Sequence, residues 1–215
     1  MQSERCNFSL NALSGRIYAI GGDSMQVAKP TNKNSVGACE CYNPDTDTWE
    51  SVQPIPGYRT EHAGATWGHF LFVSGGLQKD IVLSSMCYYN PETDVWEHKA
   101  PMLTPRAGHV MLVMGQSLYV CGGWLKDSET GNRILIDTID VYDIKTDQWK
   151  VLTYIPIPRY QGGTVGVDTT IYFIGGLDSD ATFNRATGML VFFIKRDIFT
   201  AKSHINIQWL PVANH

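Results

Sequence analysis

Residues 106–123, RAGHVMLVMGQSLYVCGG, form the segment that decides the fold, because its pattern recurs four times along the 215-residue chain. In each copy an Arg precedes a Gly pair by sixteen residues, and an aromatic residue stands three positions before that pair. The four copies are Arg5 with Gly21-Gly22, Arg59 with Gly75-Gly76, Arg106 with Gly122-Gly123, and Arg159 with Gly175-Gly176. Fixed spacings at several positions, joined by one segment of variable length, indicate a repeated structural unit with one variable loop.

A Tyr and a Trp complete the pattern in the first three copies. The Trp stands ten residues before the next Arg, and the Tyr stands seven residues before the Trp. These pairs are Tyr42 with Trp49, Tyr89 with Trp96, and Tyr142 with Trp149. The fourth copy departs from the pattern, because Trp209 is its only Trp and Lys202 stands where the Tyr is expected. We therefore divide one domain, residues 1–215, into repeats of about 5–58, 59–105, 106–158 and a degenerate 159–215.

Each repeat is typical of four short strands joined by turns. In the third repeat the apolar runs His109–Met114 and Leu118–Cys121 predict the first two strands, and the Gly pair ends the second. The third strand ends at Tyr142 before the turn sequence DIKTD, and the fourth opens on Trp149. No stretch of useful length has the period of an amphipathic helix. Sheets that are apolar on both faces must stack, and their twist makes the stack close radially, so we expect an all-β propeller with one blade for each repeat.

Charge and composition narrow the classes of partner. The formal net charge of -4 gives no electrostatic reason to expect nucleic acid or an anionic membrane as partner. The N-terminal sequence MQSERCNFSL lacks the apolar core of a signal peptide, and the apolar run Met189–Ile194 is too short to cross a bilayer. Five Cys at non-equivalent repeat positions do not indicate a disulfide framework. We therefore expect reduced thiols and a cytoplasmic, or alternatively nuclear, protein.

The Gly pairs with their preceding aromatics, the Tyr-to-Trp spacing and the Arg after Pro together resemble the kelch repeat. The segments FSLNALSGRIYAIGG (residues 8–22) and ECYNPDTDTW (residues 40–49) look most like kelch domains of the BTB–BACK–kelch type. The resemblance covers about residues 5–180 and implies a kelch-type β-propeller with four recognisable blades, part of a larger ring of about six. No BTB or BACK domain is recognisable in this chain.

The same resemblance implies a protein-interaction module. In proteins of this type the propeller captures a protein substrate or peptide segment for a cullin-RING ubiquitin ligase, while the BTB domain binds the cullin. Kelch domains also bind actin, so a cytoskeletal scaffold is the alternative function that the resemblance implies.

Enzymes with propeller folds supply a third alternative. Sialidases use an arginine triad, but Arg59, Arg106 and Arg159 recur at one repeat position, which favours a structural role. Kelch folds include copper radical oxidases such as galactose oxidase. However, His62 and His109 also recur, three residues after the Arg, without recognisable further ligands. No glycine motif for nucleotide binding follows a strand. We therefore predict that the chain is not an enzyme and binds neither a metal nor a cofactor.

Positions that break the repeat are the candidates for recognising a partner. In kelch propellers the binding face is formed by residues just after the repeat Arg and by loops after the Gly pair. The candidate partner-binding residues are Asn7, Asp23, Glu61, His62, Gln78, Asp80, His109, Trp124, Asp127, Tyr160, Gln161 and Asp178. We expect Trp124 to be an exposed anchor, with folding onto its own loop as the alternative. Acidic residues outnumber basic ones in this set, which favours a positively charged partner segment.

Overall fold

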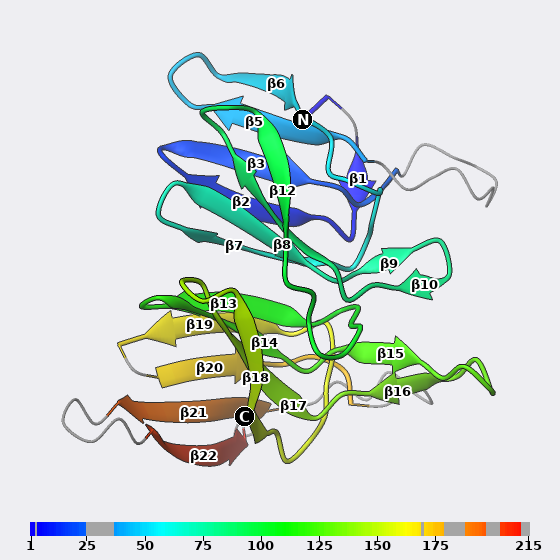
Figure 1. Cartoon of the computed structure of the whole chain (residues 1–215), viewed down its shortest axis with the longest axis vertical. Coiled ribbons are helices and arrows are strands. Elements are labelled where there is room, and N and C mark those ends of the chain that lie inside the picture. Colours follow the sequence, from blue (N-terminus) through cyan, green and yellow to red (C-terminus); the bar gives the residue numbers. More distant parts are fainter. Residues whose placement is uncertain (3, 25–36, 169, 179–187, 197–202, 212–215) are drawn as a thin grey trace. The chain divides into compact units, whose positions relative to one another are not determined.

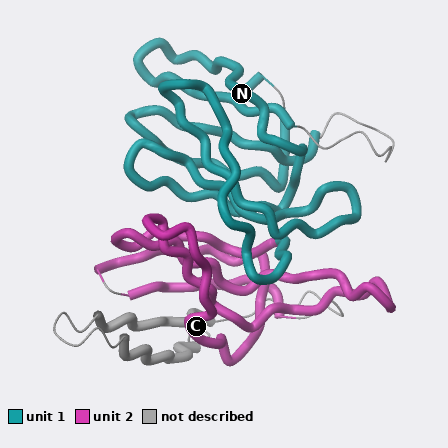
Figure 2. Tube along the Cα trace, viewed as in Figure 1, with its two compact units in different colours: residues 1–107 teal, residues 108–215 magenta. Residues whose placement is uncertain are grey.

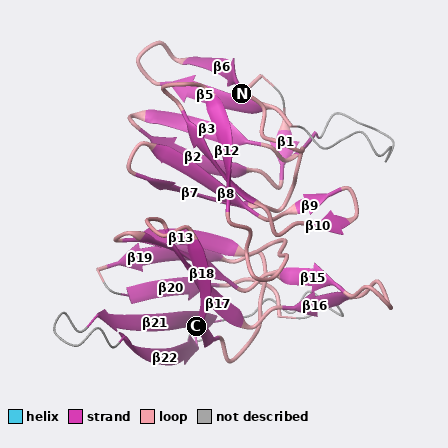
Figure 3. Cartoon of the chain, in the orientation of Figure 1, coloured by secondary structure: helices cyan, strands magenta, loops and turns pink. Residues whose placement is uncertain are grey.

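The described parts of the chain consist of β-strands and loops (Figure 3). The computed structural model describes residues 1–2, 4–24, 37–168, 170–178, 188–196 and 203–211, with the backbone alone for the last two ranges. These ranges contain no helix, and therefore none that is long and apolar enough to cross a membrane. The prediction of an all-β fold is confirmed.

The strands form two compact units, residues 1–107 and 108–215 (Figure 2). Each unit contains two four-stranded antiparallel sheets (Figure 1). Within each sheet the four strands lie side by side in the order in which they follow one another along the chain. In the first unit, the first sheet consists of β2 (Ser9–Leu13), β3 (Arg16–Ile20), β5 (Cys39–Asn43) and β6 (Thr48–Val52). The second sheet consists of β7 (Ala63–Trp67), β8 (Phe70–Ser74), β11 (Met86–Asn90) and β12 (Val95–Lys99).

The second unit repeats this arrangement. Its third sheet consists of β13 (Val110–Met114), β14 (Ser117–Cys121), β17 (Thr138–Asp143) and β18 (Gln148–Tyr154). The fourth sheet consists of β19 (Gly163–Val167), β20 (Thr170–Ile174), β21 (Gly188–Arg196) and β22 (Ser203–Pro211). The fourth sheet has four strands although its sequence departs from the repeat. Its backbone register differs, because Trp209 lies opposite Leu190, whereas the Trp of each earlier sheet lies opposite a Tyr.

The turn between the third and fourth strands is alike in the first three sheets. A Tyr hydroxyl donates to the carboxylate of an Asp five residues later at 2.6–2.7 Å, and the Tyr and Trp ring centroids lie 5.0–5.2 Å apart. These Asp residues have φ of 53–56°, a left-handed conformation in which Asp is enriched. The residues concerned are Tyr42, Asp47 and Trp49; Tyr89, Asp94 and Trp96; Tyr142, Asp147 and Trp149. The spacing of seven therefore places the Tyr and Trp opposite each other across a tight turn.

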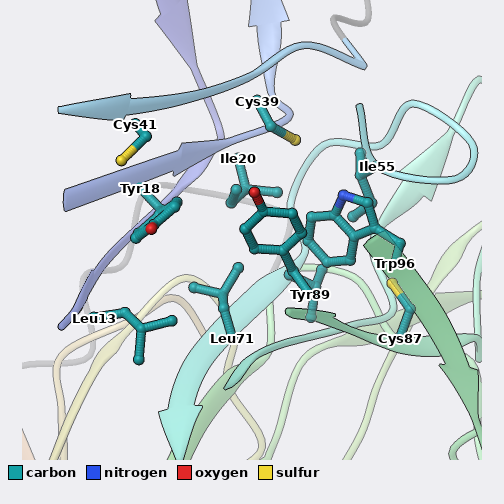
Figure 4. Close-up of a cluster of buried hydrophobic side chains, with 11 residues drawn as sticks. Leu13, Tyr18, Ile20, Cys39, Cys41, Ile55, Leu71, Cys87, Tyr89 and Trp96 are labelled. Atoms are coloured by element: carbon teal, nitrogen blue, oxygen red, sulfur yellow. The ribbon is translucent and has the colours of Figure 1, made fainter. Parts of the chain in front are cut away.

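The first and second sheets pack face to face around one core (Figure 4). Tyr89 and Trp96 of the second sheet lie side by side in this core. The indole N–H of Trp96 donates to the carbonyl oxygen of Gln53 at 2.9 Å, just beyond the last strand of the first sheet. The remaining buried members are Leu13, Tyr18, Ile20, Cys39, Cys41, Ile55, Leu71, Val73 and Cys87. The repeated Trp of the second sheet is thus a packing residue between sheets.

The repeat Arg and the Gly pair are joined by two kinds of hydrogen bond. The guanidinium of Arg59 donates to the carbonyl oxygen of Gly75 at 3.1 Å, sixteen residues away, and Arg5 and Arg159 make the equivalent bond. The N–H of Gly22 donates to the carbonyl oxygen of Arg59, which belongs to the following sheet, at 3.0 Å. Gly22 has φ of +96°, and a Cβ there would lie 2.6 Å from the carbonyl oxygen of Cys6. The second glycine of the pair is therefore required by both conformation and space.

Three two-stranded ribbons lie in segments where the sequence varies between repeats. They pair β1 (Arg5–Cys6) with β4 (Asp23–Ser24), β9 (Leu77–Gln78) with β10 (Ile81–Val82), and β15 (Trp124–Lys126) with β16 (Arg133–Leu135). Each ribbon uses residues directly after a Gly pair. The variable loops are therefore partly built from short strands.

Candidate functional site

In three of the repeats, the segment after the repeat Arg pairs with the segment after the Gly pair of the same repeat. Cys6 pairs with Asp23 in the first ribbon, and Thr60 forms an isolated antiparallel bridge with Leu77. Tyr160 forms the same bridge with Leu177, with N–H to oxygen distances of 2.9 and 3.0 Å in the two directions. Residues that are seventeen positions apart in sequence are thereby brought side by side. The two classes of position expected to form the binding face lie together in these three repeats.

The second residue after each repeat Arg has a left-handed backbone. These Arg+2 residues are Asn7, Glu61, Gly108 and Gln161, with φ of 53, 51, 62 and 56°. Within each unit they are joined by a backbone hydrogen bond: Glu61 N–H donates to Asn7 oxygen at 3.0 Å, and Gln161 N–H donates to Gly108 oxygen at 2.7 Å. Neighbouring repeats therefore meet at their Arg+2 residues.

Eight of the twelve expected partner-binding residues keep at least partial solvent exposure, and one of them, Asp127, is described with its ribbon below. Asn7 and Gln161 are exposed, and Glu61 is half-buried. The Asn7 amide donates to the Asp23 carboxylate at 3.4 Å, so these two side chains act together. The others are Gln78 and Asp178, which are half-buried, and Asp80, which is exposed. The structure places these residues on segments that lie beside each other, and their role in binding stays a prediction.

His62 and His109 are buried, so neither is presented to a partner at the surface. His62 Nε2 lies 3.0 Å from the hydroxyl of Ser9, and the ring packs against Gly21 of the preceding repeat, where a Cβ would lie 3.0 Å from the His62 Cε1. Burial, with a smaller contribution from the Arg59 guanidinium, lowers the pKa of His62 to about 3. The imidazole is therefore neutral at pH 7 and fills space between adjacent sheets. The expectation that His62 and His109 contact a partner is therefore corrected, because neither side chain is accessible at the surface.

Trp124 and Tyr160 are also buried, which corrects the expectation of an exposed aromatic anchor. The guanidinium of Arg133, on the paired strand of the same ribbon, lies 4.4 Å from the Trp124 ring centroid. It also lies 5.5 Å from the ring centroid of Tyr160 and donates to the Tyr160 hydroxyl at 3.3 Å. Trp124 thus folds onto its own ribbon, as the alternative stated. Arg133 was missed because the loops after the Gly pairs differ in length and sequence between repeats, so no repeat pattern marks its position.

Asp127 holds the turn of the same ribbon. Its carboxylate accepts the backbone N–H groups of Glu129 at 2.7 Å and Thr130 at 3.2 Å. These two bonds lower the pKa of Asp127, and the bond from Glu129 has the larger effect. This Asp is a turn former, so it adds little to the argument for a positively charged partner. Among the described residues, no group of three or more His, Cys, Asp or Glu side chains is arranged to hold a metal ion.

Comparison with known proteins finds similarity to a family model, to curated relatives and to a solved structure. The family model for the kelch motif matches residues 4–56 and 105–154. Kelch-like protein 40 of Xenopus tropicalis is 30% identical over 190 residues, covering 88% of this chain and 29% of that protein. Alpha-scruin of Limulus polyphemus is 26% identical over 185 residues, covering 83% of this chain and 20% of that protein. The chain therefore spans less than a third of the length of these curated relatives.

The solved structure of YjhT matches 98% of this chain and 66% of its own, with a TM-score of 0.78 and 16% sequence identity. This match shows the fold. It also corrects the prediction that the chain is not an enzyme, since the propeller fold shared with YjhT is one that carries enzymes as well as binding modules. That exclusion is withdrawn. The matched motifs and the shared fold together show that the chain carries kelch motifs and has a β-propeller fold.

Proposed function

We propose that this kelch module captures a protein partner through the surface that the Arg+2 residues and the segments after the Gly pairs form in each unit. The observation that carries the proposal is the left-handed backbone at Asn7, Glu61 and Gln161. A non-glycine residue in this conformation costs on the order of 1 kcal/mol, and such strain concentrates at functional positions. Gly108 occupies the equivalent position in the third repeat without that cost. Side chains kept at the other three positions despite the cost support a role in recognition.

The partner class that we favour is a protein substrate of a cullin-RING ubiquitin ligase. The support is the match to a kelch-like protein over 88% of the chain. In this arrangement the propeller binds the substrate and a BTB domain contacts the cullin. An actin-binding scaffold is the second candidate, because scruins match over nearly as much of the chain. A cytoplasmic or nuclear location stays a prediction from sequence.

The test replaces Glu61 and Gln161 together by Gly. Glycine removes the side chains and relieves the left-handed strain, so the double variant should melt at the same temperature as the wild type or higher. Ser14→Gly is the matched control, because Ser14 is an exposed left-handed residue (φ 50°) in the turn between β2 and β3. Proximity labelling in cells, with and without blocked ubiquitin transfer, then measures partner capture.

We expect Glu61→Gly with Gln161→Gly to lose partner labelling at least about tenfold, while Ser14→Gly keeps it. Partner labelling that rises when ubiquitin transfer is blocked supports the ligase role. Cosedimentation with filamentous actin, lost in the double variant, supports the scaffold instead. Unchanged labelling in a double variant that folds normally would contradict the assigned surface.

A further inference from the structure

The strands of the fourth sheet whose side chains are described, β19 and β20, have one buried apolar face and one partly exposed face. Ile171 and Phe173 of β20 are buried in the core of the second unit. Val165 and Val167 of β19 and Ile174 of β20 are 46, 51 and 49% exposed. Alternate residues of a strand share a face, and Val165 lies directly opposite Tyr172. We define Val165, Val167, Tyr172 and Ile174 as the forward face of the fourth sheet.

The equivalent positions of the other sheets are buried. Ten residues before the Gly pair, where the fourth sheet has Val165, the residues are 7–9% exposed; these are Asn11, Ala65 and Leu112. Directly before the pair, where the fourth sheet has Ile174, they are fully buried; these are Ile20, Ser74 and Cys121. The forward face of the fourth sheet is therefore a surface that is covered in every earlier repeat.

Both units show what covers a forward face. In the first unit, Tyr18 and Ile20 of the first sheet pack against Leu71 and Val73 of the second. In the second unit, Leu112 and Cys121 of the third sheet pack in one core with Ile171 and Phe173 of the fourth. The covering residues stand four and two positions before the Gly pair of the following sheet. We call the surface that contains them the rear face of a sheet.

The first sheet carries a rear face that is not fully covered. Leu10 of β2 is 58% exposed, whereas Met111, the equivalent residue of the third sheet, is buried. Ile17 of β3 is half-buried, whereas Leu71 and Ile171 at the equivalent positions are buried. The chain thus presents both halves of the contact that joins consecutive sheets within each unit. Exposed apolar surfaces of this kind mark interaction sites on soluble proteins.

We propose that the forward face of the fourth sheet binds the rear face of the first sheet of a second copy of this chain. The contact joins two different surfaces, so it is heterologous, and each copy contributes one half. Tyr172 and Ile174 of one copy take the place that Tyr18 and Ile20 occupy within the first unit, with Val165 and Val167 beside them on the same face. Leu10 and Ile17 of the other copy supply the apolar cover. The contact reproduces between chains the sheet-to-sheet packing found within them.

Sedimentation velocity of the 215-residue chain over a range of micromolar concentrations tests the proposal. One variant combines Val165→Asp with Ile174→Asp, and a second carries Leu10→Asp, because a carboxylate cannot be buried unpaired in an apolar contact. Each variant alone should associate at least about tenfold more weakly than the wild type. Ile81→Asp is the control, since Ile81 is an exposed strand residue of β10 outside both faces. If the Asp variants fail to melt cooperatively, Val165→Thr replaces them in the sedimentation measurement, because threonine keeps the branched shape of valine and adds only a hydroxyl to the contact.

Mixing the two Asp variants separates this contact from other modes of association. The first variant keeps its rear face and the second keeps its forward face, so the mixture should form a one-to-one complex that neither variant forms alone. A wild-type chain that stays monomeric overturns the proposal, whether its own sheets or another protein cover these faces. Association that survives in either variant, or a mixture that stays monomeric, overturns it as well.

Discussion

Trp96 and Trp124 are both buried, but they are covered in different ways. Trp96 is a repeat residue of β12, stacked against Tyr89 and hydrogen-bonded to the carbonyl oxygen of Gln53 in the neighbouring sheet. Trp124 belongs to the ribbon of the third repeat, and Arg133 of the same ribbon lies over its ring. A position inside a variable loop is therefore not evidence of an exposed side chain.

The largest effect that we predict is a loss of stability in Trp96→Ala and in Trp124→Ala. Removing either buried indole leaves a cavity, which should lower the free energy of unfolding by about 3–5 kcal/mol. Trp49→Ala is the matched control, because Trp49 stands at the same repeat position as Trp96 but is half-buried, so its loss should be smaller. Urea denaturation followed by far-ultraviolet circular dichroism measures all three. A Trp124→Ala variant as stable as the wild type would restore the view of this residue as an exposed anchor.

The second prediction extends the comparison to His62, a buried ionisable residue that varies between repeats. The unfolded chain takes up a proton at His62 below about pH 6.5, whereas the folded chain does so near pH 3. Lowering the pH through this window therefore favours the unfolded chain. Between pH 7 and pH 5, the contribution of His62 to stability should fall by about 2 kcal/mol.

His62→Gln provides the reference for this measurement, because glutamine does not titrate and the other histidines are common to both proteins. Urea midpoints between pH 7 and pH 5 should fall more steeply in the wild type than in His62→Gln. Parallel pH dependence in the two proteins would show that His62 is accessible to protons in the folded state. In that case the assignment of His62 to the interior is wrong.

Repetition predicted the sheets, the Tyr-to-Trp turns and the role of the Gly pair, because each repeated residue meets the same neighbours in each repeat. The pairing of the post-Arg segments with the segments after the Gly pairs also follows from the sixteen-residue spacing. The burial of Trp124 could not be predicted in this way, since Arg133 lies nine residues farther on in a loop whose length and sequence differ between repeats. One signal at the site was present but unused: Gly108 is aligned with Asn7, Glu61 and Gln161, which hints at a left-handed backbone there.

The smallest predicted effect concerns Arg133. Its guanidinium lies over Trp124 and Tyr160 but is itself exposed, and a cation–π contact at an exposed site contributes about 0.5–1 kcal/mol. Arg133→Gln should therefore lower the free energy of unfolding by about 1 kcal/mol and shift the tryptophan fluorescence, because Trp124 loses its charged neighbour. Lys126→Gln is the matched control: Lys126 lies directly opposite Arg133 in the ribbon, so this change removes the same charge and leaves the ring contacts of Arg133 in place. Arg133→Lys should fall between the wild type and Arg133→Gln, since an ammonium keeps the charge but cannot stack as a plane. If Lys126→Gln and Arg133→Gln change stability and fluorescence equally, net charge rather than stacking accounts for the effect, and the ribbon does not depend on Arg133 to cover Trp124.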